Sequence, residues 1–354
     1  MWQKRMILHV FNPEHDLALA SNLSNFTAPH AGRQLRKDLG WLPALWAGDD
    51  DFILVENVMN AQRSYGRLRV RIDREQRKFV DKTQLSRLDI TEVRPWGWNL
   101  ALRSFLLRYG VQAVPSEDDI AGVRELSHRK HAVSLLKSLQ VSGTIGQSYE
   151  TDNMADILEY QRQYGIIVVK APWSSSGRGV RFFNDAFNES QERWIRNVID
   201  RQGTVIVEPY YHKVKDFGME FESDGEGNVR YLGLSLFLTK NGAYKGNVLQ
   251  PEDMKTVLLS HYISVELLHE VQNKICKELS VLYKNKYKGP FGVDMMIVAQ
   301  PDGGGFLLHP CVEINLRRTM GHVALAFPSF TDGFSRVMQI VLTDKYRMQV
   351  RKQR

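Results

Sequence analysis

The sequence is poor in cysteine. Its two cysteines, Cys276 and Cys311, lie far apart and fit neither a Cys-x-x-Cys nor a Cys/His spacing. This argues against a disulfide framework and a structural zinc site, and it favours a reducing cytoplasm. The N-terminal apolar run Met6–Phe11 is soon followed by a proline and two acidic residues, which makes it too short for a signal peptide or a membrane span. We therefore expect a cytoplasmic protein with no membrane partner.

No long run of one charge dominates the chain. The net charge is +7, but 47 basic and 40 acidic residues are interspersed, and the only dense basic run is the tail Lys345–Arg354. We expect that tail to be a solvated helix end, reached from a final helix over Phe334–Leu342. No stripe of aromatic and basic residues suggests nucleic acid, so a small anionic ligand such as a nucleotide suits the charge better.

The composition is that of a globular protein, with 43% hydrophobic and 25% charged residues among 354. This length predicts two or three subdomains. The first spans residues 1–125 and is expected to be a small open α/β unit. Its strands are predicted at Met6–Phe11, Phe52–Val55 and Val111–Val114, with a helix at Leu100–Tyr109.

The middle of the chain predicts helices, strands and one unusual loop. A helix follows Ser127, a second spans Met154–Tyr164, and a buried strand, Ile166–Lys170, comes directly after it. The loop Trp173–Gly179, rich in serine and glycine, follows this strand. A helix around Glu192–Ile199 and a strand at 204–208 complete this part.

Two hairpins are predicted beyond this point, with a long helix between them. The first pairs Phe217–Ser223 with Val229–Leu238, and the second pairs Gly292–Val298 with Phe306–Asn315. The helix Val265–Leu282 has apolar residues on one face.

The second hairpin carries a cluster of oxygen-bearing side chains. Asp294 and Glu313 lie at nearly equal distances from the turn, so they should face each other across the strands, and Asn315 shares the face of Glu313. Two adjacent carboxylates repel each other unless a cation intervenes. Magnesium prefers such oxygen ligands. Solvent-facing charge on an edge hairpin is the alternative interpretation.

Three features further up the chain are suited to phosphate binding. The Trp173–Gly179 loop could bring backbone N–H groups close to an anion and close as a lid, although it is neither a Walker A loop nor a Rossmann fingerprint. Lys170 ends a buried strand at the mouth of this loop, and Lys130 lies in the first turn of a helix, where the dipole favours an anion. A flexible turn and two solvent-facing lysines are equally compatible with these patterns.

In this order the motifs resemble the ATP-grasp superfamily over roughly residues 125–330. The preceding residues resemble the α/β domain that usually comes first in such proteins. The motifs that carry the resemblance are Lys130, Ile167–Pro172, Ser174–Val180, Val207–Tyr210, Gly292–Asp294 and Val312–Asn315.

The resemblance implies an α+β ATP-grasp fold in which two subdomains clasp ATP behind a pre-ATP-grasp α/β domain of residues 1–125. The small subdomain would span 126–206 with its lid at 173–179, and the large subdomain would span 207–354. It also implies ATP and one or two Mg²⁺ ions, with Mn²⁺ as a substitute. The implied phosphate contacts are Lys130, Lys170, Ser175, Ser176, Gly177, Arg178 and Gly179; those to adenine and ribose are Glu208, Tyr210 and Asp216; the metal ligands are Asp294, Glu313 and Asn315.

A cation is also needed to stabilise the charge of a phosphoryl group in transfer. Arg317, two residues after Asn315, matches the Glu-x-Asn-x-Arg form of carboxylase-like and purine-pathway branches. It is the first choice for this catalytic role, followed by Lys240 and Lys245. Pairing of Arg317 with Glu313 is the structural alternative.

The resemblance implies a ligase that activates a carboxylate as an acylphosphate for attack by an amine or another nucleophile, both small molecules. A phosphotransferase or carboxylase-type enzyme and a non-catalytic nucleotide-binding regulator are the alternatives. The family also includes many dimers, which makes a homodimer an option. For the acceptor pocket, the candidate loops are Asn12–Asp16 and Arg94–Asn99, and His15 is either a binding residue or part of a turn.

Overall fold

The computed structural model describes residues 5–72, 77–174, 179–184, 187–240, 243–300, 303–328, 330 and 334–352. The chain forms two compact units. Unit 1 comprises residues 1–124, 245–250 and 317–354, and unit 2 comprises residues 125–244 and 251–316. Among the described residues, no helix combines the length and the apolar character that crossing a membrane requires.

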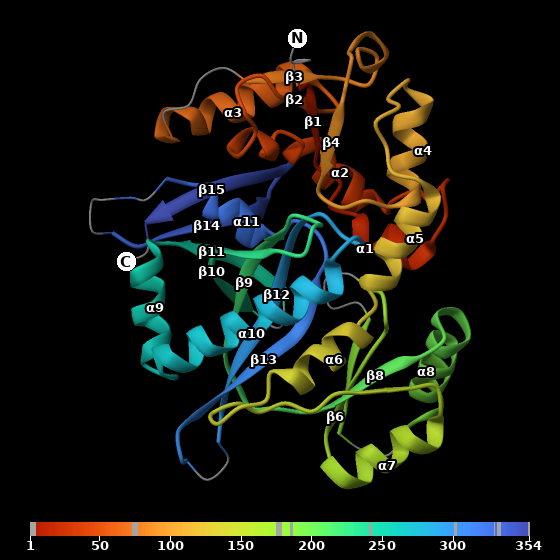
Figure 1. Ribbon diagram of the computed structural model, residues 1–354, viewed down its shortest axis with the longest axis vertical. Helices are drawn as coiled ribbons and strands as arrows, with labels where there is room; N and C mark the ends of the chain where they lie inside the picture. The colour runs from red at the N-terminus through yellow and green to blue at the C-terminus, as the bar shows by residue number, and fades with distance from the viewer. Residues whose placement is uncertain are drawn as a thin grey trace. The chain divides into compact units, whose positions relative to one another are not determined.

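Unit 1 is built on a parallel sheet, as expected for an open α/β domain. Its strand order is β3-β2-β1-β4 (Figure 1). The strands are β1 Ile7–Val10, β2 Phe52–Leu54, β3 Lys78–Val80 and β4 Glu92–Pro95. All four residues of β1 are buried, which explains its three aliphatic side chains, and the fourth residue, His9, pairs with Asp51 at 2.9 Å.

Short helices connect these strands. They are α1 His15–Ser21, α2 His30–Leu39, α3 Val58–Ile72, α4 Leu100–Arg108 and α5 Glu117–Leu126, with 3₁₀ turns at η1 Leu42–Leu45 and η2 Leu85–Arg87. The predicted helix at 100–109 is confirmed as α4, and Asn99 caps its start by accepting a bond from the Leu102 amide.

The strand predicted at Val111–Val114 is wrong. This segment is irregular, and the edge beside β1 is taken by β4, which the sequence did not reveal. The amide of Val111 donates instead to the carbonyl of Leu106 at the end of α4. The apolar side chain is still buried, so the run marks a core segment and not a strand.

The C-terminal part of unit 1 is a β-hairpin. After α11 Met320–Leu325, strand β14 Arg336–Leu342 pairs along its whole length with β15 Tyr346–Lys352, and β14 also pairs with β11 Ala243–Leu249. The predicted final helix and helical tail are therefore wrong. Short apolar runs suit either structure, and pairing between strands decided this one. Figure 1 shows β14 and β15 beside α11.

One apolar cluster joins the two ends of the chain within unit 1. Leu39 and Trp41 from the N-terminal part share it with Val323, Phe327 and Met338. The compact units therefore differ from the predicted subdivision in that residues 317–354 pack with the N-terminal segment and not with the large subdomain.

Unit 2 contains two antiparallel sheets. The smaller has the order β5-β8-β6-β7, from β5 Tyr149–Thr151, β6 Ile167–Lys170, β7 Val180–Phe183 and β8 Val205–Pro209. Helices α7 Met154–Tyr164 and α8 Glu189–Gln202 pack on it through a shared apolar cluster that includes Ile157 and Ile195. The helix predicted at Met154–Tyr164 and the strand predicted at Ile166–Lys170 are confirmed as α7 and β6, whereas residues 175–178 of the predicted loop lie outside the described residues.

The larger sheet of unit 2 carries both predicted hairpins. Its order is β13-β12-β9-β10, from β9 Lys213–Ser223, β10 Val229–Lys240, β12 Gly289–Ala299 and β13 Phe306–Asn315. The remaining helices are α6 Lys130–Ser138, α9 Glu252–Ser260 and α10 Val265–Tyr283. Both hairpins and the long helix are confirmed.

Candidate active site

The expected cross-strand cluster forms on β12 and β13. Asp294 stands directly opposite Glu313 in the antiparallel register, as its distance from the turn predicted. The side-chain amide of Asn315 donates to Asp294 Oδ2 at 3.0 Å. Three oxygen-bearing side chains therefore gather on one face of the sheet.

This cluster suits a hard divalent cation. The donor set is two carboxylates and an amide, which are ligands that Mg²⁺ prefers. On the neighbouring strand β9, Gly218 stands opposite Asp294, and a Cβ at this glycine would come within 3.3 Å of Asp294 Oδ1. The absence of a side chain at position 218 leaves room beside the carboxylate.

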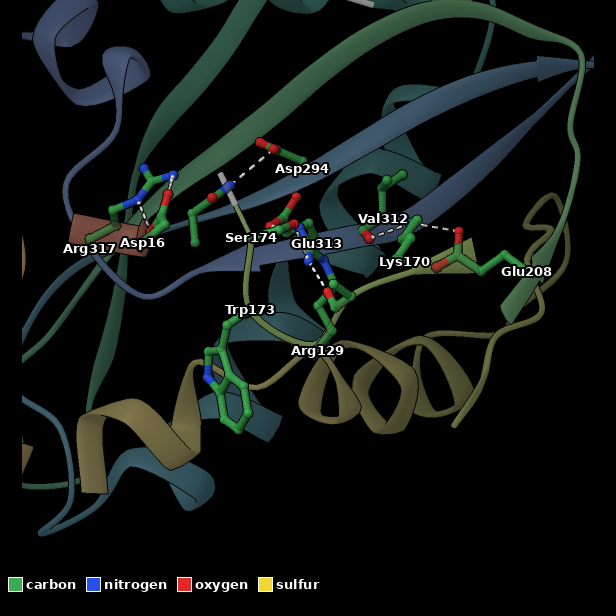
Figure 2. A network of polar contacts seen from close by, with 12 residues as sticks. Asp16, Arg129, Lys170, Trp173, Ser174, Glu208, Asp294, Val312, Glu313 and Arg317 are labelled. Carbon is green, nitrogen blue, oxygen red and sulfur yellow. Dashed lines mark hydrogen bonds and ion pairs between the residues drawn. The ribbon is translucent and has the colours of Figure 1, made fainter. Parts of the chain in front are cut away.

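A buried arginine reaches this cluster. Arg129 Nη2 lies 2.6 Å from Glu313 Oε1, and Nη1 donates to Ser174 Oγ at 2.8 Å and to the carbonyl of Ala171 (Figure 2). The side chain is only 7% exposed. Arg129 thus connects the start of α6, the base of the Trp173–Gly179 loop and a predicted metal ligand.

The neighbouring Lys130, which the resemblance assigned to phosphate, makes a different contact. Its ammonium pairs with Glu125 Oε1 at 2.5 Å, and its side chain is 39% exposed. Sequence reasoning passed over Arg129, although a second cation directly before Lys130 was the available signal.

A second buried ion pair lies beside the first. Lys170 Nζ is 2.6 Å from Glu208 Oε2, and both side chains are 8% exposed. Lys170 also donates to the carbonyl of Val312, next to Glu313, at 3.2 Å. In the register of β6 and β8, Lys170 faces Ile206, so Glu208 is its diagonal neighbour on the same face. The structure brings together two residues that the resemblance assigned separately, Lys170 to phosphate and Glu208 to adenine and ribose.

The two ends of the loop after β6 are held close together. The amide of Ala171 donates to the carbonyl of Gly179 at 2.7 Å, and a Cβ on Gly179 would come within 2.3 Å of Ser174 Cβ. Only glycine fits at this position without displacing Ser174, which is a partner of Arg129. Ser175, Ser176, Gly177 and Arg178 lie outside the described residues.

Comparisons with known proteins identify the fold of this chain. No family model and no curated protein matches the chain. Among solved structures, N5-carboxyaminoimidazole synthetase from Staphylococcus aureus aligns over 97% of this chain and 83% of its own, with a TM-score of 0.51 and 12% identity. An ATP-grasp superfamily protein from Archaeoglobus fulgidus aligns over 99% and 100%, with a TM-score of 0.50 and 12% identity. This chain has the ATP-grasp fold.

Two residues that the resemblance assigned to adenine and ribose, Tyr210 and Asp216, come after β8 in the sequence. Tyr210 is 42% exposed, and its ring makes edge contacts with Phe182 and His212. Asp216, on β9, pairs with Lys213 at 2.6 Å and accepts from Thr239 at 3.0 Å. Both residues belong to unit 2, and their nucleotide contacts stay predictions.

One histidine inside the ATP-grasp unit was not foreseen. His309, on β13, is fully buried, and neither ring nitrogen has a partner in the described part of the chain. Burial, helped by the nearby Lys170 charge, lowers the pKa of His309 to about 3. Its ring packs edge-on against Tyr211 and close to Gly146. The imidazole is thus uncharged at neutral pH.

The three predicted catalytic cations have different surroundings. Arg317, in unit 1, forms a two-point pair with Asp16, at 2.8 Å from Nε and 2.7 Å from Nη2, in place of the pairing with Glu313 that was the structural alternative. Lys245 is exposed on β11. The side chain of Lys240 lies outside the described residues.

The two candidate acceptor loops of unit 1 contact each other. The Asn12 amide donates to the carbonyl of Gly97 at 2.8 Å, and His15 Nδ1 lies 3.2 Å from Asn99 Nδ2. His15 is 1% exposed, and burial lowers its pKa to about 4. A Cβ at Gly97 would come within 2.6 Å of the His15 ring, which supports the structural role of His15 in this turn.

Proposed function

We propose that this protein is an ATP-dependent ligase, which transfers the γ-phosphate of ATP to a carboxylate and passes the acyl group to an amine or another nucleophile. The observation that carries the proposal is the set of contacts around Glu313. A carboxylate opposite Asp294 is held by a buried arginine, beside a second buried cation, in an ATP-grasp fold. Solved structures with this fold include a synthetase.

The side chains have distinct proposed tasks. Arg129 and Lys170 contact the phosphates, because both are buried cations that converge on β13. Glu208 orients Lys170 and lies at the adenine end. The lid role of residues 175–178, which lie outside the described residues, and the roles of Arg317, Lys240 and Lys245 as catalytic cations remain predictions.

The metal ligands are proposed to be Asp294, Glu313 and Asn315. When bound there, Mg²⁺ would neutralise phosphate charge and screen the repulsion between the two carboxylates. Glu313 would then exchange some of its contact with Arg129 for the metal. The guanidinium, released from Glu313, would be free to meet an incoming phosphate.

The proposed reaction has two steps, phosphoryl transfer and then acyl transfer. A carboxylate oxygen forms a bond to the γ-phosphorus, the bond to the β,γ-bridging oxygen breaks, and ADP leaves. The nucleophile then attacks the acyl carbon, inorganic phosphate leaves with the electron pair, and the nucleophile loses a proton. Because acylphosphates hydrolyse, the site must exclude water, which is the proposed task of the loop.

An oxygen-isotope experiment tests this function. ADP release is measured with ATP, Mg²⁺ and a panel of ¹⁸O-labelled amino acids, hydroxy acids and dicarboxylates, each with and without amines. The proposal predicts that one acid and amine pair stimulates turnover and that one ¹⁸O atom moves from the acid to inorganic phosphate. The double variant Asp294→Asn/Asn315→Ala should abolish both signals.

Other outcomes identify the alternatives. ADP release with the phosphate retained on the product would indicate a phosphotransferase. ATP binding with no stimulation by any acceptor would favour a regulatory protein. Absence of ATP binding would contradict all three functions.

A further inference from the structure

Unit 1 contains a pocket of about 610 Å³ at the carboxyl ends of parallel strands. Its lining includes residues that directly follow β1, β2 and β3, together with part of α4, and every lining residue belongs to unit 1. Open α/β sheets bind ligands at this edge, and the volume is in the range of small-molecule sites. The charges of the lining indicate what kind of ligand fits.

A buried carboxylate oxygen in this pocket has no partner. Glu14 is 8% exposed; its Oε1 pairs with Arg36, whereas Oε2 is buried and has no hydrogen-bond partner in the described part of the chain. Burial raises the pKa of Glu14, and the Arg36 charge opposes this. Burying a carboxylate oxygen without a hydrogen-bond partner lowers the stability of the folded protein. A ligand that donates a hydrogen bond to Oε2 would remove this cost.

The same guanidinium serves a second acid. Arg36 Nε lies 3.3 Å from Glu56 Oε1, so one positive charge stands between two carboxyl groups. With both acids ionised, Arg36, Glu14 and Glu56 together carry one net negative charge, while Arg33, which also lines the pocket, donates to the carbonyl of Ala28. A ligand amine or ammonium group matches this net negative charge better than a neutral hydroxyl does.

Basic side chains line another part of the pocket. Arg108, at the end of α4, is exposed and has no ion pair within the described residues. Lys82, which follows β3, lines the same pocket, and its ammonium lies 5.6 Å from the ring of Tyr109. The acid next to Lys82 in the sequence, Asp81, accepts bonds from Thr83 instead. This part of the lining suits a carboxylate or a phosphate.

We propose that this pocket binds the nucleophile of the ligase reaction, a small amine that carries a carboxylate or phosphate at its other end. The amine lies against Glu14 and the anion against Lys82 and Arg108. Only the assignment as nucleophile rests on the proposed function; the binding chemistry comes from unit 1 alone. In the reaction the amine nitrogen bonds to the acyl carbon, the bond from that carbon to the phosphate oxygen breaks, phosphate leaves, and the amine proton passes to solvent.

The loop that contributes Glu14 is tied to the chain segment after β13. Asp16, two residues after Glu14, forms the two-point pair with Arg317 (Figure 2). Arg317 follows the predicted metal ligand Asn315 by two positions in the sequence. This pair gives the Arg317 side chain a structural reason to be retained whatever its catalytic role.

Calorimetric binding to the full chain without ATP tests the pocket. The probes are the common amino acids and a series of aminoalkyl phosphates, each compared with the amine lacking its anion and with its N-acetyl form. We expect at least one zwitterion to bind, and each truncated form to bind about tenfold more weakly or worse. Carboxylate and phosphate probes distinguish the two anions.

Variants locate the binding site. Lys82→Ala/Arg108→Ala should weaken the zwitterion by about tenfold or more and leave the anion-free amine unchanged, because both side chains are exposed and only the anion contacts them. Glu14→Gln should weaken the binding of both the zwitterion and the anion-free amine. The matched control is Arg87→Ala, an exposed arginine of unit 1 outside the pocket. Failure of every probe to bind, or equal binding by all variants, would overturn the proposal.

The proposed function is tested separately on the same proteins. A fluorescent ATP analogue should bind the pocket variants as well as it binds the unchanged protein. If ATP does not bind at all, the ligase function fails, and the calorimetry still tests the pocket. If ligase turnover persists and the pocket variants leave the KM for the amine unchanged, only the pocket assignment fails.

Discussion

Charged side chains gather in both units, but they are paired differently. In unit 2, Lys170 and Glu208 pair at 2.6 Å, and so do Arg129 and Glu313. In the pocket of unit 1, one oxygen of Glu14 has no partner, and Arg108 has no ion pair among the described residues. Each charge of the first group is paired with an opposite charge, whereas the second group leaves the charge of Arg108 without one.

This difference affects what a ligand must displace when it binds to each region. The nucleotide and metal proposed for unit 2 would have to replace bonds between protein groups, so their binding should rearrange side chains that are already paired. In unit 1 a ligand would add bonds without breaking any. Removing one member of a pair should therefore be costly in unit 2, which the following experiments test from the largest expected effect to the smallest.

Lys170→Met should destabilise the protein by about 3–5 kcal/mol, because it leaves Glu208 as an unpaired buried carboxylate. The double variant Lys170→Met/Glu208→Gln should recover most of this loss. Urea unfolding measures both, with the exposed Lys277→Met on α10 as control. A loss below about 1 kcal/mol in the single variant would show that the pair is not insulated from water.

Glu313→Gln should lower ADP release by about 100- to 1000-fold, because the amide keeps the size of the side chain and removes the charge offered to the metal. Turnover is measured at several Mg²⁺ concentrations. The control is Glu278→Gln, an exposed glutamate on α10. If excess Mg²⁺ restores the full rate, the role of Glu313 is metal affinity alone; an unchanged rate at all concentrations would contradict the site.

Arg129→Ala should weaken ATP binding by about 10- to 100-fold, whereas Lys130→Ala should change it by no more than about twofold. The reason is burial: Arg129 is 7% exposed and reaches Glu313, while Lys130 is 39% exposed and pairs with Glu125. Equilibrium binding of a fluorescent ATP analogue compares the two neighbouring cations directly. A larger loss of ATP binding in Lys130→Ala than in Arg129→Ala would indicate that Lys130 contacts the phosphates.

His309, also in unit 2, lacks such pairing, because neither of its buried ring nitrogens has a partner in the described part of the chain. Its pKa falls from an ordinary value of 6.5 to about 3 on folding, so between these values the unfolded state binds more protons. The stability that His309 contributes is complete above pH 6.5 and is lost progressively as the pH falls toward 3. From pH 6.5 to 5 this amounts to about 2 kcal/mol.

Urea unfolding at pH 7 and pH 5 checks this contribution. The variant His309→Gln, which does not titrate, should lose about 2 kcal/mol less over this range than the unchanged protein. Its control is His261→Gln, an exposed histidine. An identical pH dependence in all three proteins would mean that His309 is accessible to protons while folded.

The sequence predicted the parts of the site that depend on local rules. Asp294 was placed opposite Glu313 because residues equally distant from a tight turn face each other. Lys170 and Glu208 were each named as site residues from motifs at the ends of buried strands, although their pairing was not predicted. The parallel sheet of unit 1 and both hairpins of unit 2 followed from apolar patterns and turn residues in the same way.

What the sequence did not predict depends on contacts between distant segments. Neighbouring residues at a helix start point in directions about 100° apart, so sequence alone could not decide whether Arg129 or Lys130 reaches Glu313. The strand β14 has an apolar run that also suits a helix, and its pairing with β15 and β11 decided the structure. The Glu14–Arg36 pair joins a loop and a helix and has no local signal.

The packing of β14 and β15 against the N-terminal part has a consequence for biosynthesis. The apolar cluster of Leu39 and Trp41 includes Met338, and the amide of Tyr346 donates to Asp38 at 2.9 Å. When the ribosome has made the first half of the chain, this cluster still lacks the side chains that the C-terminal part contributes. Unit 2 can complete its sheets earlier, so a nascent chain should remain open to chaperones at its N-terminal end until residues beyond 336 emerge.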